Sequence, residues 1–157
     1  MKRTLVLIMS LLVILVGCKN EDDELNPGQA ILGIYQKTDR EISDELDFVR
    51  IIELKQGQKV VAQSTARNKG ESEDLGYQYY YEGTYKLEDK VLVIDFTETF
   101  HLTDPDISYL PKVDLPEVSR EYFFEDRYTV SEDYQELTFI CPPNALCMPP
   151  TPFEKIN

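Results

Sequence analysis

The sequence predicts a single mainly β domain built as an antiparallel barrel, with a two-layer β-sandwich as the alternative. Several stretches alternate apolar and polar side chains with a period of two, which is typical of strands with one buried face. Short polar turns separate these stretches, so that seven or eight strands follow one another as a meander. A meander of that size can close on itself and remove its exposed edges, and the same pattern would also serve a sandwich.

The first 17 residues are predicted to be a signal peptide. Met1-Lys2-Arg3 is a short basic start, and residues 5–16 form a 12-residue apolar run interrupted only by Ser10. Such a run is too short to span a bilayer comfortably and fits the apolar region of a signal peptide. A buried helix is the alternative, but the run carries no amphipathic stripe. We therefore expect residues 1–17 to be removed.

The apolar run ends in Leu15-Val16-Gly17-Cys18, which resembles the bacterial lipobox, a cysteine preceded by a small residue. The resemblance implies cleavage after Gly17 and attachment of a diacylglyceryl group to the sulfur of Cys18. In Gram-negative cells it also implies acylation of the new terminal amine, by a fatty acid such as palmitate. Two or three acyl chains are enough to anchor a lipoprotein stably to a membrane.

Residues 18–29 are predicted to be a lipidated acidic tether. Lys19-Asn20 is followed by Glu21-Asp22-Asp23-Glu24, which looks like the surface-export signal of some Gram-negative lipoproteins. That resemblance implies an outer-membrane protein that faces the medium. The alternative is a solvated, self-repelling linker. The β domain is expected to occupy residues 30–157.

The first half of this domain is predicted to hold three strands and one helical segment. Asp39–Asp47 begins with a residue that suits a helix N-cap, and Ile42 and Leu46 are four apart, so one or two helical turns are expected. Gln56-Gly57-Gln58 is typical of a hairpin turn, and Arg67–Gly76 is expected to be a polar loop. The strands are expected at Ile31–Thr38, Phe48–Lys55 and Lys59–Ala66.

The clearest alternation lies between Tyr77 and Leu87, where aromatic and aliphatic side chains share one face and polar side chains the other. Gly83 occupies the place where this apolar face is interrupted, and it is expected to mark a kink or a close approach of another backbone. The apolar face consists of Tyr77, Tyr79, Tyr81, Tyr85 and Leu87.

The second half of the domain is predicted to continue the meander. Thr103–Ser119 holds three prolines and little periodicity, so a long loop is expected, and loops of that length are either functional or loose. Tight turns are expected at Glu88-Asp89-Lys90 and Ser131-Glu132-Asp133. The strands are expected at Val91–Thr97, with an extension toward Leu102, and at Arg120–Val130, Tyr134–Ile140 and Phe153–Ile156.

Three segments of the domain resemble lipocalin-like proteins. Leu32-Gly33-Ile34-Tyr35 looks like their Gly-x-Trp motif, with tyrosine in place of tryptophan. Gly83–Leu87 followed by Val91–Ile94 is similar to a hairpin of small lipocalin-like lipoproteins, and Tyr128–Val130 with Glu136–Phe139 resembles a later hairpin of the same group. The resemblance implies a lipocalin-like barrel with a non-enzymatic binding or structural role. The chain has no tryptophan, so the tryptophan plug of the barrel floor is absent or remade with Tyr35.

The cysteines at positions 141 and 147 are predicted to form a disulfide. An envelope or cell-surface location is oxidising, and five intervening residues do not match the Cys-x-x-Cys spacing of redox or metal pairs. Closing so short a loop stabilises the fold by roughly 2–3 kcal/mol in the chain-entropy model. The pair Cys141 and Cys147 is therefore expected to be a structural link.

The sequence offers no catalytic or metal-binding pattern. His101 is the only histidine, and it is expected to be exposed because it follows Asp95, Thr97 and Thr99 on the polar face of its strand. No nucleophile motif accompanies it, and the acids at 104 and 106 do not match the EF-hand spacing. We expect no enzymatic activity, no cofactor and no metal. The formal net charge of −13 argues against nucleic-acid binding, because so acidic a surface repels phosphates.

The candidate ligand-binding residues are those predicted to face the lumen of the barrel. Several phenol hydroxyls inside a barrel must find partners, and Arg50 and Asp126 share the parity of their apolar neighbours, which would give the lumen a polar character. The alternative is a filled core with hydroxyls and charges reaching the rims. The candidates are Tyr35, Arg50, Tyr77, Tyr79, Tyr81, Tyr85, Tyr122, Asp126 and Tyr128.

Together these observations predict a lipid-anchored envelope lipoprotein that binds a small apolar or glycan-like ligand without catalysis. The alternative is an accessory protein of the envelope that meets another envelope protein, for which an exposed apolar patch around Leu146 and Met148 is expected. The first predicts an enclosed pocket of several hundred cubic ångströms lined by the tyrosines. The second predicts a packed lumen.

Overall fold

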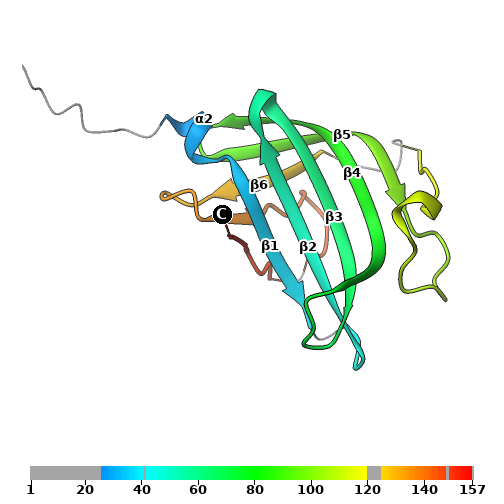
Figure 1. The fold of residues 1–157 in the computed structure, drawn as a ribbon. Helices are drawn as coiled ribbons and strands as arrows, with labels where there is room; N and C mark the ends of the chain where they lie inside the picture. Colours follow the sequence, from blue (N-terminus) through cyan, green and yellow to red (C-terminus); the bar gives the residue numbers. More distant parts are fainter. Residues whose placement is uncertain (1–25, 41, 120–124, 148, 157) are drawn as a thin grey trace, which may run out of the picture.

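The computed structural model describes residues 26–40, 42–119, 125–147 and 149–156, and it shows a closed barrel of eight antiparallel strands (Figure 1). Each strand pairs with its neighbours along the chain, and the first strand also pairs with the last, so the sheet has no free edge. The predicted antiparallel barrel is confirmed, and the sandwich is excluded. The predicted signal peptide, Cys18 and residues 19–25 of the tether lie outside the described residues.

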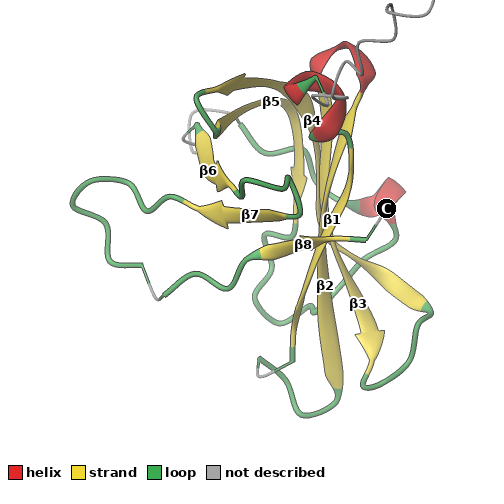
Figure 2. Ribbon diagram, turned by 90° about the vertical axis from the view of Figure 1, so that its left-hand side faces the viewer, coloured by secondary structure: helices red, strands yellow, loops and turns green. Residues whose placement is uncertain are grey.

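Five long strands and three short ones make up the barrel. The long strands are β1 (Gly33–Asp39), β2 (Leu46–Lys55), β3 (Lys59–Asn68), β4 (Asp74–Glu88) and β5 (Val91–His101). The short strands are β6 (Asp126–Val130), β7 (Glu136–Phe139) and β8 (Phe153–Lys155). In Figure 2, β2 and β3 extend well beyond β7 and β8 at one end. We call this the open end, because the wall there is complete only on the side of the long strands.

The other end of the barrel, the closed end, is covered by a short helix, α2 (Pro27–Ala30) (Figure 1). The side chain of Asn26 caps it by accepting a hydrogen bond from the amide of Gly28 at 3.0 Å, and proline occupies the first helical position, where its missing N–H costs nothing. Lys155 Nζ donates to the carbonyl of Ala30 at 2.7 Å and ties the helix to β8. Residues 27–29, expected in the tether, are therefore helical.

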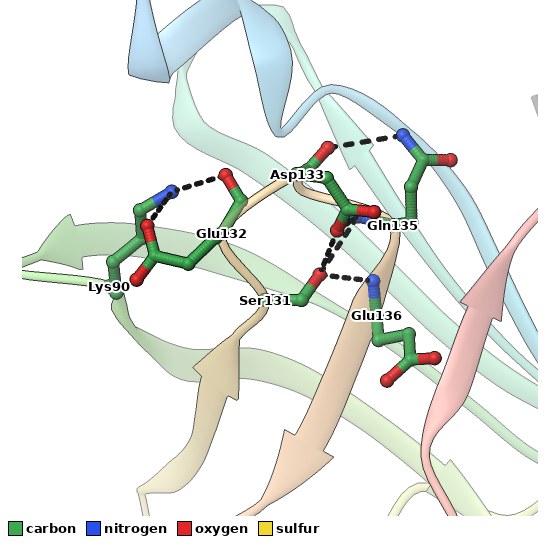
Figure 3. Close-up of polar contacts among 6 residues, drawn as sticks. All are labelled: Lys90, Ser131, Glu132, Asp133, Gln135 and Glu136. Atoms are coloured by element: carbon green, nitrogen blue, oxygen red, sulfur yellow. Dashed lines mark hydrogen bonds and ion pairs between the residues drawn. The ribbon is translucent and has the colours of Figure 1, made fainter.

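Two hairpin turns at the closed end are held by specific contacts. Gly57, in the turn η2 (Gln56–Gln58), has a φ of 72°, which glycine adopts without strain. In the turn between β6 and β7, Ser131 Oγ accepts hydrogen bonds from the amides of Gln135 and Glu136 and donates one to Asp133 (Figure 3). Lys90 Nζ donates to the carbonyl of Glu132 at 3.1 Å (Figure 3) and links the β4–β5 turn to this one.

Three register shifts interrupt the pairing of the central strands. One leaves Leu75 as an extra residue in β4 between the pairs Ala66–Gly76 and Arg67–Asp74, and the other two bear on the interior of the barrel. Ser64 pairs with Tyr79 whereas Thr65 pairs with Tyr77, so that Gln78 is an extra residue in β4. Glu82 pairs with Glu98 whereas Gly83 pairs with Phe96, so that Thr97 is an extra residue in β5. An extra residue shifts the alternation of every side chain beyond it to the other face.

The apolar core fills the closed half of the barrel. Inward-facing side chains of every strand meet there, which explains the alternation seen in the sequence. Leu92 and Ile94 of β5 and Leu137 of β7 are fully buried, and Leu54 of β2 is nearly so. The cluster also includes Ile31, Tyr35, Ile52, Val60, Ala62, Tyr81, Tyr85, Phe96, Tyr128, Val130 and Phe153.

Several boundaries differ from those expected. The predicted helical turns at Asp39–Asp47 are wrong: β1 runs through Asp39, and the described residues after it form bends before β2 begins at Leu46. The predicted polar loop is shorter, because β3 and β4 extend into it as far as Asn68 and Asp74. The long loop after β5 is fixed by backbone hydrogen bonds, among them Tyr77 N to Leu110 O at 2.7 Å, and it includes a helical turn, η3 (Lys112–Asp114).

Candidate functional site

A cavity of about 770 Å³ lies at the open end of the barrel. Its walls come from the end of β1 and the residues after it, from β2, β4, β6 and β7, and from the segment that leads into β8. The strands β6–β8 are shorter than the strands opposite them, so the cavity is open to solvent on their side and walled by the long strands on the other. Its volume is in the range of cavities that hold small ligands. The lining residues are Lys37, Thr38, Asp39, Arg40, Ile42, Arg50, Tyr79, Tyr81, Asp126, Tyr128, Phe139, Pro149, Pro150, Thr151 and Phe153.

Aromatic rings form the inner part of this cavity. The rings of Tyr79 and Tyr81 are stacked with centroids 4.6 Å apart, and Tyr128 packs edge-to-face against Phe139 and Phe153. Rings held in this way lose little conformational freedom when a ligand packs on them. Burial raises the pKa of Tyr79 to about 12 and the pKa of Tyr128 well above its ordinary value. These phenols are therefore neutral at physiological pH and can donate or accept hydrogen bonds.

The β1–β2 side of the cavity carries a mixed-charge cluster. Arg50 Nε lies 2.7 Å from Asp39 Oδ2, and Lys37 Nζ lies 3.6 Å from Asp39 Oδ1. The pairing holds the arginine against the wall of the barrel and offsets much of its charge. In the register of the sheet, Lys37 of β1 lies opposite Arg50 of β2, so the two side chains point to the same face of the sheet.

Asp126, at the start of β6, carries a carboxylate on the opposite side of the cavity. It accepts a hydrogen bond from Tyr128 Oη at 3.3 Å, and it forms no ion pair with any other residue that the structure describes. Burial raises its pKa, and the hydrogen bond from Tyr128 partly opposes that rise. Among the described residues, Asp126 is thus a carboxylate of the cavity wall that lies beside aromatic rings and has no cationic partner.

His101 was expected on the exposed face of its strand, and that expectation is wrong. The bulge at Thr97 turns Thr99 and His101 toward the interior; Thr99 is 3 % exposed, and the imidazole of His101 stacks on Tyr79 at an interplanar angle of 6°. His101 Nδ1 is hydrogen-bonded to the hydroxyl of Tyr81. Burial lowers the pKa of His101. The histidine therefore supports the tyrosine wall.

The eight described residues among the nine lumen candidates separate into three groups. Arg50, Tyr79, Tyr81, Asp126 and Tyr128 line the cavity together. Tyr35 and Tyr85 face the interior at the closed half, where Tyr35 is completely buried. Tyr77 lies on the outer surface of the barrel. Tyr122 belongs to a segment that the structure does not describe.

Tyr35 and Tyr85 belong to the floor of the barrel. The hydroxyl of Tyr35 lies 3.0 Å from the carbonyl oxygens of Ile31 and Tyr134 and bridges α2 to the β6–β7 turn. The hydroxyl of Tyr85 donates to the carbonyl of Lys55 at 3.3 Å, and its ring borders a second cavity of about 430 Å³ beneath α2. Tyr35 thus fills the floor of the barrel.

Tyr77 does not share a face with Tyr79, contrary to the alternation. The bulge at Gln78 puts it opposite Thr65 and turns its ring to the outer surface, where it packs against Tyr80 with centroids 6.4 Å apart. The ammonium group of Lys112 lies 3.2 Å from the centroid of the Tyr80 ring. Tyr77 therefore helps to attach the long loop and takes no part in the cavity.

The loop between β7 and β8 borders the mouth of the cavity and projects from the barrel (Figure 2). The sulfur atoms of Cys141 and Cys147 lie 2.05 Å apart, a disulfide distance, as predicted. Two residues beyond this closed loop, Pro149–Thr151 contribute to the cavity wall. Leu146 is fully exposed within the loop, and Met148 lies outside the described residues.

No family model, curated protein or solved structure matches the chain. In the described parts of the chain, acidic, histidine and cysteine side chains do not gather in any group of three that could hold a metal ion. Over the same residues, helices of the length and apolarity needed to cross a bilayer are not found.

Proposed function

We propose that this chain is a non-catalytic binding module that holds a small ligand in the open-end cavity of its barrel. One observation carries the proposal: a cavity of about 770 Å³ whose wall combines stacked tyrosine rings with Arg50 and Asp126. Concave sites of this size with an apolar lining and a few convergent polar groups are typical of small-molecule binding. A ligand with an apolar or glycan-like face and at least one polar group would fit this lining.

The arrangement favours binding over catalysis. Catalysis by acid and base needs two groups that converge on one reacting atom. In the cavity Asp39 is engaged by Arg50 and Lys37. The other acid of the described lining, Asp126, lies on the opposite wall. The single histidine is stacked behind the tyrosines. We therefore propose a binding role without a chemical step.

We further propose that the module is attached to the outer membrane through lipid on Cys18 and faces the cell surface. The support is the lipobox-like sequence at 15–18 and the acidic segment that follows it. Residues 18–25 would then join the lipid to the capped, closed end of the barrel, since α2 follows directly. The cavity opens at the other end of the barrel and would face away from the membrane.

Native mass spectrometry of the lipidated protein, purified from its own host, tests the binding role. We expect a small molecule to be retained by the wild type and lost from Tyr79→Ala, which removes a ring from the cavity wall. Tyr80→Ala is the matched control, because its ring lies on the outer face beside Lys112. The proposal would be overturned if Tyr79→Ala and Tyr80→Ala retained the molecule equally. It would also be overturned if neither the wild type nor either variant retained a molecule.

A second candidate function is favoured by the exposed disulfide loop. Leu146 is fully exposed on a segment fixed by Cys141 and Cys147, and an apolar residue on a rigid, projecting loop can anchor an interface with another envelope protein. Crosslinking in whole cells through a photoreactive residue at position 146 tests it. A defined crosslinked partner, lost when Leu146 is replaced by Ser in a separate pull-down, would favour this function.

A further inference from the structure

The two carboxylates of the open-end cavity differ in how the protein neutralises them. Asp39 has Arg50 at 2.7 Å and Lys37 at 3.6 Å. Asp126 has only the hydroxyl of Tyr128, at 3.3 Å, and no cationic side chain of the described residues lies within ion-pair distance of it. A neutral hydrogen-bond donor compensates a partly buried carboxylate far less than a cation does. Within the described residues, the cavity thus presents one carboxylate, that of Asp126, without a cationic partner.

The surroundings of Asp126 are those that attract a cation. Tyr79, Tyr81 and Tyr128 line the same cavity, and the faces of aromatic rings carry negative potential that binds ammonium groups. Tyr79 and Tyr81 present stacked rings, and Tyr128 stands beside the carboxylate to which it donates. An ammonium group in this place would meet a carboxylate and ring faces together.

Three basic residues line the cavity, Lys37, Arg40 and Arg50. Arg40 is exposed to solvent, where water and salt screen its charge, and the other two are engaged by Asp39. Arg50 Nε is occupied by Asp39, and Lys37 contacts the other oxygen of the same carboxylate. The formal net charge of the whole chain is −13, and a field of that sign raises the local concentration of cations. The net charge of the chain and the carboxylate of Asp126 therefore favour a cationic group on the β6 side of the cavity.

We propose that the open-end cavity recognises an organic cation, an alkyl- or arylammonium group seated between Asp126 and the rings of Tyr79 and Tyr128. The inference rests on the proposed binding function and specifies its ligand class. The ammonium N–H groups donate to the carboxylate, and the apolar part of the ligand packs on Tyr81 and Phe153. The cavity volume leaves space for a body larger than the ammonium group itself.

Binding of three small probes with one shared body tests the charge preference. 2-Phenylethylamine is cationic at pH 7, 2-phenylethanol is neutral and phenylacetate is anionic. Isothermal titration calorimetry on the ligand-free, full-length lipidated protein in detergent should give an affinity for the amine at least about tenfold above that for the alcohol, the difference expected of a charge-assisted hydrogen bond. Phenylacetate should bind more weakly than either.

Asp126→Asn isolates the carboxylate, and Asp114→Asn is its matched control. Both variants change the net charge equally, but Asp114 lies exposed in η3. Asp126→Asn should lose the preference for the amine while still binding the alcohol, and Asp114→Asn should keep it. Tyr128→Phe keeps the ring and should keep most of the preference.

The inference is overturned if the alcohol or phenylacetate binds as tightly as the amine, or if Asp126→Asn keeps the wild-type preference. An absence of binding by all three probes would overturn it as well. A neutral or anionic molecule found by native mass spectrometry would overturn the cation preference and leave the binding function supported. Only the proposed binding function requires that Tyr79→Ala lose the molecule that the wild type retains. The binding function and the cation preference can therefore fail separately.

Discussion

Tyr81 on β4 and His101 on β5 are joined inside the barrel by a hydrogen bond between Tyr81 Oη and His101 Nδ1, with their rings 17° from parallel and their centroids 6.0 Å apart. Burial raises the pKa of Tyr81 and lowers the pKa of His101 from 6.5. Both groups are therefore neutral at pH 7, and the tautomer of the imidazole sets which of them donates. The pair orients the ring that forms the inner wall of the cavity.

Acidification should destabilise the barrel through His101. Because the folded state lowers the pKa of this base, the unfolded chain binds the proton more readily, and stability falls as the pH drops below 6.5 toward the folded pKa. Urea unfolding at pH 7.5 and pH 5 should show a smaller loss of stability for His101→Phe than for the wild type. Equal losses for the two proteins would contradict this account.

The inward position of His101 shows where sequence reasoning stops. Alternation identified the barrel, most of its strands and five of the cavity-lining residues, because burial on one face imposes a period of two. It failed for the residues before Gln78 in β4 and after Thr97 in β5. A single extra residue in either strand reverses the pattern without any local signal. Tyr77 was thus placed inside and His101 outside, and both are reversed.

Other differences have equally specific causes. Asp39 suits a helix N-cap, but its carboxylate pairs with Arg50 across β1 and β2, and this pairing between strands outweighs a local preference. The residues Pro149–Thr151, which complete the cavity, had no recognisable pattern, because their place depends on how the disulfide loop returns to β8. The interruption of the apolar face at Gly83, in contrast, was visible in the sequence.

Gly83→Ala should strongly destabilise the barrel. A Cβ at this position would lie 2.2 Å from the carbonyl oxygen of Asp95 and 2.7 Å from the Cα of Phe96, because the bulge in β5 presses its backbone against Gly83. Backbone atoms of a paired strand cannot move aside cheaply, so we expect a loss of about 2–3 kcal/mol in the free energy of unfolding, measured by urea denaturation.

Gly28→Ala is the control for this substitution. Its added Cβ would meet only Asn26 Oδ1, at 3.4 Å, and alanine is favoured over glycine in a helix. Its stability should equal or slightly exceed that of the wild type. A Gly83→Ala protein as stable as Gly28→Ala would show that β5 does not press on Gly83.

Tyr35→Phe should destabilise the floor of the barrel without changing its shape. The hydroxyl of Tyr35 lies 3.0 Å from the carbonyls of Ile31 and Tyr134 in a completely buried site. Removing it leaves buried acceptors unpaired, at a cost of about 1–2 kcal/mol. Thermal unfolding should show a lower midpoint than for Tyr80→Phe, whose hydroxyl bonds Glu82 on the outer face. Equal midpoints would mean that water reaches the floor.

Replacement of Cys141 and Cys147 by serine should lower the free energy of unfolding by about 2 kcal/mol, since the disulfide closes a short loop and restricts the unfolded chain. Reducing agent should lower the stability of the wild type by a similar amount and leave the double variant unchanged, which can be followed by urea denaturation. A wild type indifferent to reductant would show that the loop does not constrain the folded barrel or the unfolded chain.

Asp126→Asn should stabilise the ligand-free protein at neutral pH. Burial raises the pKa of Asp126 above 3.8 in the folded state, and the phenols around it, Tyr79 and Tyr128, stay neutral. The ionised carboxylate therefore costs stability above the folded pKa, and this cost is absent below 3.8, where both states are protonated. Differential scanning fluorimetry should give a higher midpoint than wild type at pH 7 and equal midpoints at pH 3, with Asp114→Asn unchanged at both. A lower midpoint for Asp126→Asn at pH 7 would mean that a cationic group of the protein already neutralises the carboxylate. The expected higher midpoint would show that the protein keeps this charge at the expense of its stability, as is common for groups that bind ligands.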